Sequence, residues 1–158
     1  YIPGVVEEIY NKEGVLINTI GTFIQGIIGI GGEKKGQIKC LVNSESEKID
    51  ESIINENLKD KIIICGSYID HKIYLKAKEM NVSGIVCGGV DYNTISKILG
   101  YSLGVAITGT ENTTTLILTD GFGEVNMAKK NFDLLKENQN KIASINGATQ
   151  IRAGVLRP

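Results

Sequence analysis

The stretch "KIIICGSYIDHKIYLKAKEMNVSGIVCGG" (61–89) decides the fold. It contains two continuous apolar runs, 61–65 and 83–89, of the kind that forms strands buried on both faces. A helix is predicted between them over 71–81, and the side chain of Asp70 is suited to cap its first turn. The stretch therefore predicts a β-α-β unit with parallel strands and a right-handed crossover.

Further elements are predicted on the carboxyl-terminal side of this unit. Asp91 can cap a second, short helix that ends at Gly100. The runs "GVAITG" (104–109) and "TTTLILT" (113–119) then predict a third and a fourth buried strand.

A third helix is predicted to begin near Asn126. The chain then returns to β-structure in "KIASI" (141–145) and "TQIRAGVL" (149–156), which are joined through the turn sequence Asn146-Gly147. This pattern predicts a closing hairpin.

The amino-terminal part shows only strand signals, over 5–10, 14–19, 22–30 and 36–42. Four short consecutive strands predict an antiparallel meander, curled into a small barrel-like layer. The stretch "GIIGIGGEKKG" (26–36) has the glycines and lysines of a phosphate loop. It lacks the spacing of one, however, and no helix follows to supply free N–H groups, so we interpret it as a turn.

The expected fold is therefore mixed α/β (α+β): the amino-terminal β-layer packs beside a short parallel β-α-β core with a closing hairpin. The expected division is a β-rich subdomain (1–43), a linker with a short helical turn (44–60) and the core (61–158). We expect these parts to form one compact unit excised from a longer protein.

Composition excludes several classes of protein. The 17 basic and 18 acidic side chains leave a net charge of −1, without the basic excess of a nucleic-acid or membrane-surface protein. No run approaches the roughly 20 apolar residues of a membrane span. Cys40, Cys65 and Cys87 lie in separate apolar runs, which favours buried reduced thiols and a cytoplasmic location. With His71 as the lone histidine, we expect no metal site and no cofactor.

Three loops are candidates for a binding site, because open α/β sheets bind ligands at the carboxyl ends of their strands. These are loops 88–93, 108–115 and 119–124, which combine glycines with hydroxyls and carboxylates. Their candidate residues are Gly88, Gly89, Asp91, Thr108, Gly109, Thr110, Glu111, Asp120, Gly121 and Glu124. The alternative interpretation is that these loops are ordinary polar turns.

Arg152 is unusual because it lies inside an otherwise apolar strand pattern. A guanidinium group there must face solvent, a carboxylate or a ligand, since burying it unpaired is prohibitive. The alternatives are an internal salt bridge to Glu124 or Glu111, or an anion site formed with Gln150.

Two resemblances extend these expectations. The segment "HKIYLKAKEMNVSGIV", which begins at His71, resembles the phosphohistidine swivelling domains, although the Gly-Gly-x-x-Ser-His lead-in is absent; this resemblance implies a swivelling β/β/α-like fold. The segments 1–19, 21–38, 104–125 and 143–158 resemble the central part of a family of uncharacterised bacterial multi-domain proteins. That resemblance implies a biotinyl/lipoyl-like barrel-sandwich region upstream and a KOW-like stretch downstream. It implies no activity.

We therefore expect a non-catalytic module that binds a ligand or a partner within a larger cytoplasmic protein. Its expected partners are other domains of that protein or a second copy of the chain, and not nucleic acid or membrane. The alternative is an enzyme or small-molecule sensor that binds an anionic ligand at the three loops together with Arg152.

Overall fold

The computed structural model of the chain describes residues 4–108 and 113–148, with eight strands, three α-helices and two short 3₁₀ helices. Six strands form one mixed sheet in the order β3-β7-β6-β5-β4-β8, and the first two form a separate hairpin. The fold is thus α+β, as expected. The strands are β1 (Val5–Tyr10), β2 (Gly14–Asn18), β3 (Ile28–Ile30), β4 (Glu33–Cys40), β5 (Lys61–Ile64), β6 (Gly84–Val90), β7 (Thr115–Phe122) and β8 (Ile142–Asn146).

The predicted β-α-β unit is confirmed. Strands β5 and β6 pair in parallel, and helix α1 (His71–Glu79) connects them. The Asp70 carboxylate accepts a hydrogen bond from the backbone N–H of Ile73 at 2.9 Å, which caps the helix as expected. Strand β4 on one side and β7 on the other extend the parallel set to four strands.

The second helix is longer than predicted. Helix α2 (Tyr92–Thr108) continues through Gly100, so the predicted strand 104–109 is wrong. Leu99, Leu103 and Ala106 keep the helical spacing in the sequence, and a short apolar run by itself does not distinguish a strand from a helix. An interior glycine costs a helix only about 1 kcal/mol, so it does not force the helix to end.

The pairing of the first strands also differs from the prediction. Strand β3 pairs with β7, and β4 pairs with β5 and β8, so 5–42 does not form a four-stranded meander. Gly31 and Gly32 carry the chain from the edge strand β3 to β4, which lies next to the opposite edge strand β8, and Gly31 has a φ of 99°. This short link is possible because the sheet curls: the Oγ1 of Thr115 and the N–H of Gly147 both donate to the carbonyl of Gly32, at 2.8 and 3.4 Å. The result is a half-barrel.

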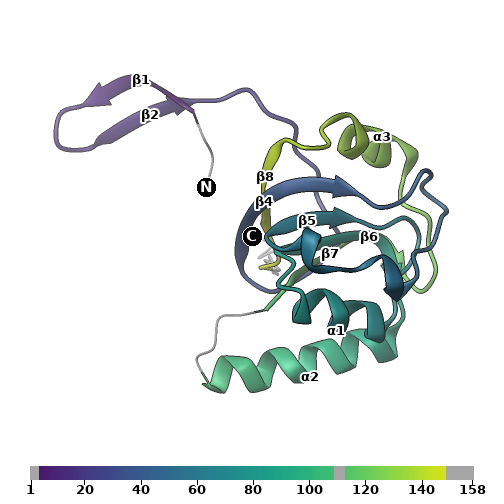
Figure 1. The fold of residues 1–158 in the computed structure, drawn as a ribbon. Helices are drawn as coiled ribbons and strands as arrows, with labels where there is room; N and C mark the ends of the chain where they lie inside the picture. Colours follow the sequence, from purple (N-terminus) through teal and green to yellow (C-terminus); the bar gives the residue numbers. More distant parts are fainter. Residues whose placement is uncertain (1–3, 109–112, 149–158) are drawn as a thin grey trace, which may run out of the picture.

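The sheet is buried on both faces (Figure 1). One face, which includes Ile63 and Ile85, packs against α1 and α2. The other face, which includes Ile62 and Ile64, packs against α3 (Lys129–Glu137) through Phe132. Alternation along β5 thus sends neighbouring isoleucines into two separate cores. Helix α3 begins three residues after the predicted start.

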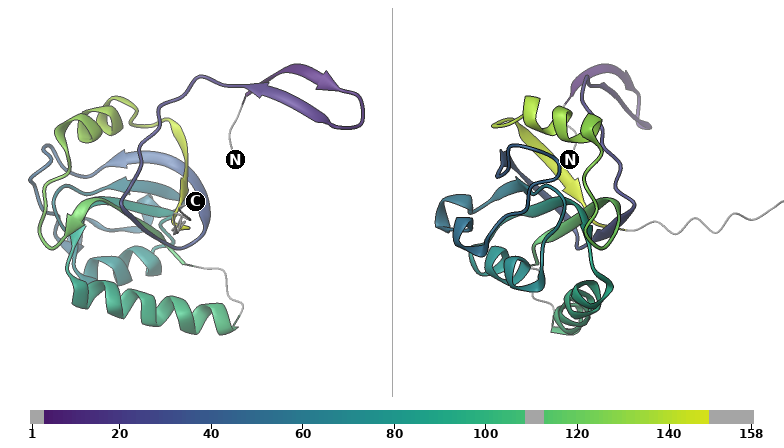
Figure 2. Two further views of the ribbon diagram at one scale, coloured as in Figure 1. Left: turned by 180° about the vertical axis from the view of Figure 1, so that it is seen from behind. Right: turned by 90° about the vertical axis from the view of Figure 1, so that its right-hand side faces the viewer.

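The boundary between the parts of the chain lies earlier than predicted. Strands β3 and β4 belong to the main sheet, so 1–43 is not a separate subdomain. Only β1 and β2 stand apart, and Figures 1 and 2 show this hairpin projecting from the body. The polar segment 44–60 carries two 3₁₀ helices, η1 (Glu51–Ile53) and η2 (Glu56–Leu58).

Two further expectations concern the end of the chain and the thiols. Strand β8 forms as predicted, but its predicted hairpin partner, 149–156, lies outside the described residues. Cys40, Cys65 and Cys87 are free thiols, of which Cys40 is only half-buried. Burial raises the pKa of all three. Among the described residues, no helix is both long and apolar enough to cross a membrane.

Candidate functional site

The carboxyl edge of the sheet brings together six of the predicted site residues. The loops that follow β5, β6 and β7 meet there through backbone hydrogen bonds. Gly88 N–H donates to Gly66 at 2.8 Å and Gly89 N–H donates to Ser67 at 3.1 Å. The six residues at this edge are Gly88, Gly89, Asp91, Asp120, Gly121 and Glu124.

The glycines at this edge accommodate the protein's own backbone. A methyl group on Gly88 would overlap the carbonyl oxygen of Val125, and one on Gly89 would overlap that of Gly123. A methyl group on Gly66 would overlap the carbonyl of Glu47 in the same way. The space in which we expected a ligand to approach these glycines is therefore filled by neighbouring loops. Their role in ligand binding stays a prediction.

Asp91 accepts three hydrogen bonds from groups of the fold. Its carboxylate accepts hydrogen bonds from Tyr68 Oη at 2.6 Å, from Thr94 Oγ1 at 2.7 Å and from Thr94 N–H at 2.9 Å, which caps α2. The hydrogen bond from Tyr68, followed by those from Thr94, lowers the pKa of Asp91 to about 2. The same bond raises the pKa of Tyr68 to about 12. Asp91 thus has a structural role as a cap.

Replacing Asp91 with asparagine should destabilise the fold at pH 7 by about 1 to 2 kcal/mol. Asparagine can still cap α2, but the oxygen that accepts from Tyr68 and from Thr94 Oγ1 becomes an amide group that cannot accept. The folded pKa lies below the ordinary value of 3.8, so this stabilisation is present above pH 3.8 and is lost as the pH falls towards 2. The difference between the two proteins, measured by urea unfolding at several pH values, should therefore shrink in acid. Asp133→Asn is the control, because Asp133 forms only an exposed pair with Lys129. A difference that is independent of pH would contradict the assignment.

The other two acids at this edge also have partners within the fold. Asp120 accepts from Thr119 Oγ1 at 2.5 Å and from the N–H of Ala128 at 3.0 Å, just before α3. Glu124 forms an ion pair with Lys48 at 2.7 Å, in which both side chains are about half exposed. Exposed pairs of this kind contribute little to stability.

Residues 113–115, the described end of the predicted loop 108–115, lie at the opposite edge of the sheet. Thr115 pairs with Gly84 at the start of β6, whereas Phe122 pairs with Val90 at its end. The two ends of β7 are roughly 25 Å apart. The expectation of a common rim for 108–115 and 119–124 is therefore wrong, because α2 returns the chain to the amino edge before β7 begins. Gly109, Thr110, Glu111, Gln150 and Arg152 lie outside the described residues.

A polar cavity of about 300 Å³ opens at this amino edge, and we call it the amino-edge pocket. Its lining comes from β4, from the turn before β5, from the connection between α1 and β6, and from the residues before β7. The residues are Lys34, Lys59, Asp60, Lys78, Asn81, Val82, Ser83, Thr113 and Thr114. Sequence reasoning missed the pocket, except that Thr113 and Thr114 fall in one predicted loop. The sequence does contain a pattern that could have predicted the pocket, because lysines lie shortly before the starts of both β5 and β6.

The projecting hairpin, which we call the arm (residues 4–23), is the second feature that sequence reasoning missed. Every residue of the arm is exposed. Cross-strand partners lie on the same face of a hairpin, and Val6 pairs with Ile17 while Ile9 pairs with Val15. Simple alternation would place Val6 and Ile9 on opposite faces, but a register shift between Val6 and Glu8 brings them together. All four side chains therefore form one aliphatic face.

Both faces of the arm expose apolar side chains, but only one of them pairs aliphatic residues alone. The aliphatic face carries Val6 (50% exposed), Ile9 (74%), Val15 (53%) and Ile17 (49%). The opposite face carries Glu8, whose carboxylate accepts from Tyr10 Oη at 2.5 Å, together with Val5 and Leu16. An isolated two-stranded hairpin is at best marginally stable in water. The arm therefore has the composition of a surface that is covered by a partner.

The residue types that commonly bind metals lie apart from one another in residues 4–108 and 113–148. No group of three His, Cys, Asp or Glu side chains is close enough there to hold a metal ion. His71 is the first residue of α1 and is half-buried. The resemblance of the segment that begins at His71 to the phosphohistidine swivelling domains stays a prediction.

Comparison of the chain with protein-family models, curated proteins and solved structures found no match. The resemblance to the central part of a bacterial multi-domain family therefore stays a prediction, and the chemistry of the site rests on its own residues.

Proposed function

We propose that this chain is a non-catalytic assembly module of a larger cytoplasmic protein, and that it associates with a second copy of itself through the arm. The observation that carries this proposal is the aliphatic face formed by Val6, Ile9, Val15 and Ile17 on a projecting hairpin. Burying apolar surface is the main driving force for association. The three free thiols support the cytoplasmic location.

A second arm is the partner that this face fits best. Two identical aliphatic faces can pack across a two-fold axis, because such an interface is self-complementary. The remaining exposed large apolar residues in the described part of the body are spread over several elements, and only Tyr92 and Leu99 share one, helix α2. The full set is Ile53, Leu75, Tyr92, Leu99, Phe122 and Ile142, together with Ile27 just before β3.

The size of the arm predicts the strength of the association. A stable interface uses about 20 to 30 residues from each partner. Only one face of the arm would lie in the interface, which is fewer residues than that range, so we expect a weak dimer that dissociates in the micromolar range. Packing two hairpins face to face would place their sheets about 10 Å apart.

Replacing Ile9 and Ile17 together with serine should weaken dimerisation by at least tenfold, because two buried aliphatic side chains contribute more than 1.4 kcal/mol. Sedimentation velocity from about 1 to about 200 µM, with native mass spectrometry for stoichiometry, would measure the change. The matched control is Val5→Ser with Leu16→Ser, which makes the same kind of change on the opposite face.

The control variant should dimerise like the unmodified chain. A monomer at every concentration would overturn the proposed self-association. An equal loss in both double variants would show that the aliphatic face is not the contact. Far-UV circular dichroism checks that the body stays folded in each variant.

A further inference from the structure

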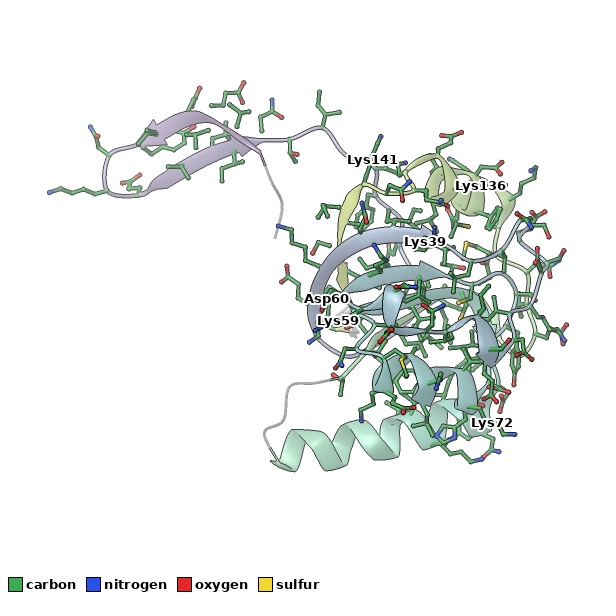
Figure 3. The ribbon with its side chains drawn as sticks, viewed as in Figure 1. Lys39, Lys59, Asp60, Lys72, Lys136 and Lys141 are labelled. Carbon is green, nitrogen blue, oxygen red and sulfur yellow. The ribbon has the colours of Figure 1, made fainter. Side chains whose placement is uncertain are left out.

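We infer that the amino-edge pocket binds a small molecule that carries a phosphate group. This site is independent of the proposed assembly role, because its lining comes from the body and not from the arm. A volume of about 300 Å³ is at the lower end of the range for small-molecule sites. Figure 3 shows Lys59 and Asp60 together at this end of the sheet.

The charge around the pocket favours an anion. Three lysines and one aspartate line it. Within 4–108 and 113–148, Lys59 and Lys78 form no ion pair with a carboxylate, and Lys78 is half-buried. Like charges that share a cavity repel one another, and burial reduces the screening by water. An anion bound between them would relieve this repulsion.

The walls of the pocket are fixed by hydrogen bonds between elements. The N–H of Asp60 donates to Asn81 at 2.9 Å, and both residues have positive φ values, 60° and 56°. Deeper in the pocket, Thr114 Oγ1 donates to the carbonyl of Val82 at 2.9 Å. Tyr74 Oη then donates to the carbonyl of Thr114 at 3.0 Å. A cavity that is held in this way is largely formed before a ligand arrives.

The donors in the pocket suit phosphate better than carboxylate. The hydroxyl groups of Ser83 and Thr113 line it and are partly exposed. Lysine binds phosphate as a point charge, and a phosphate group carries more negative charge than a carboxylate and three acceptor oxygens that several donors can share. Phosphate oxygens can accept from ammonium and hydroxyl groups at the same time.

Replacing both Lys59 and Lys78 with glutamine should weaken the binding of pyrophosphate at least tenfold, because charged hydrogen bonds are lost. We expect the unmodified chain to bind pyrophosphate saturably with a Kd of about 1 mM or tighter. Isothermal titration measures the affinity. Amide chemical shifts in a ¹⁵N-labelled sample, with Ser83 and Thr114 expected to move, locate the site. The control Lys72→Gln with Lys130→Gln removes the same charge from exposed positions outside the pocket.

The control variant should bind within about twofold of the unmodified chain, because exposed charges outside the pocket are screened by salt. If both double variants lost the same affinity for pyrophosphate, the binding would come from general electrostatic attraction to the protein, and the assignment of the site would be wrong. The absence of saturable binding, or tighter binding of citrate than of pyrophosphate, would overturn the assignment to phosphate. Thermal unfolding of each variant confirms that the fold is retained.

Discussion

Replacing Gly88 with alanine should destabilise the fold by roughly 3 kcal/mol, at the upper end of the usual cost of overpacking. The added methyl group would overlap the carbonyl oxygen of Val125 and lie 2.7 Å from the backbone nitrogen of Met127. These atoms are backbone, so they cannot move aside as a flexible side chain would. The segment must shift instead, and with it the buried Met127 that it carries into the core.

Gly121→Ala is the matched control, since it adds the same methyl group at the same edge of the sheet. Its nearest neighbour there is a methyl group of Val125 at 3.7 Å, an ordinary contact. We expect a change of less than about 1 kcal/mol. Urea unfolding of the two variants measures the difference. Equal stability of the two would contradict the close backbone packing, and would reopen the carboxyl edge as a place for a ligand.

Replacing Phe132 with alanine should cost about 3 to 5 kcal/mol, the usual range for a buried phenylalanine. Phe132 is only 2% exposed and packs in the core that includes Ile38, Met127 and Ile145. It is the fully buried side chain of α3, so its removal leaves a cavity and detaches that helix from the sheet. Urea unfolding followed by far-UV circular dichroism would measure this loss of stability as a lower midpoint concentration.

Phe122→Ala is the control for this substitution, because Phe122 lies at the end of β7 and is 57% exposed. The same atoms are removed, but little buried area is lost, so we expect a change below about 1 kcal/mol. If the two variants unfold at the same urea concentration, α3 does not stabilise the inner face of the half-barrel.

The expected effects of these substitutions distinguish the parts of the molecule that stabilise the fold from the surfaces that are available for binding. The carboxyl edge is occupied by its own loops, by the Asp91 cap and by the Lys48–Glu124 pair. Neither the arm nor the two pocket lysines to be replaced, Lys59 and Lys78, belong to either core. The proposed assembly role and the proposed phosphate site therefore use surfaces that can be mutated without unfolding the body.

Part of the candidate site followed from the sequence. The grouping of Gly88, Asp91, Asp120 and Glu124 at one edge was predicted, because loops that leave parallel strands meet at their carboxyl ends. The placement of 113–115 was not, since it depended on whether "GVAITG" was a strand or the end of α2. A strand parallel to β6 would end at the carboxyl edge of the sheet, whereas α2 brings the chain back to the amino edge, where β7 begins.

The sequence by itself determined the β5-α1-β6 unit, the caps at Asp70 and Asp91 and the strand character of β7 and β8. Apolar periodicity and capping depend on residues within a few positions of one another, so they can be read locally. Only the tertiary structure decided that β3 pairs with β7, that the sheet curls, and that a bulge gathers four aliphatic residues on the arm. Most residues form the same backbone hydrogen bonds between strands. The sequence therefore does not show which strand pairs with which.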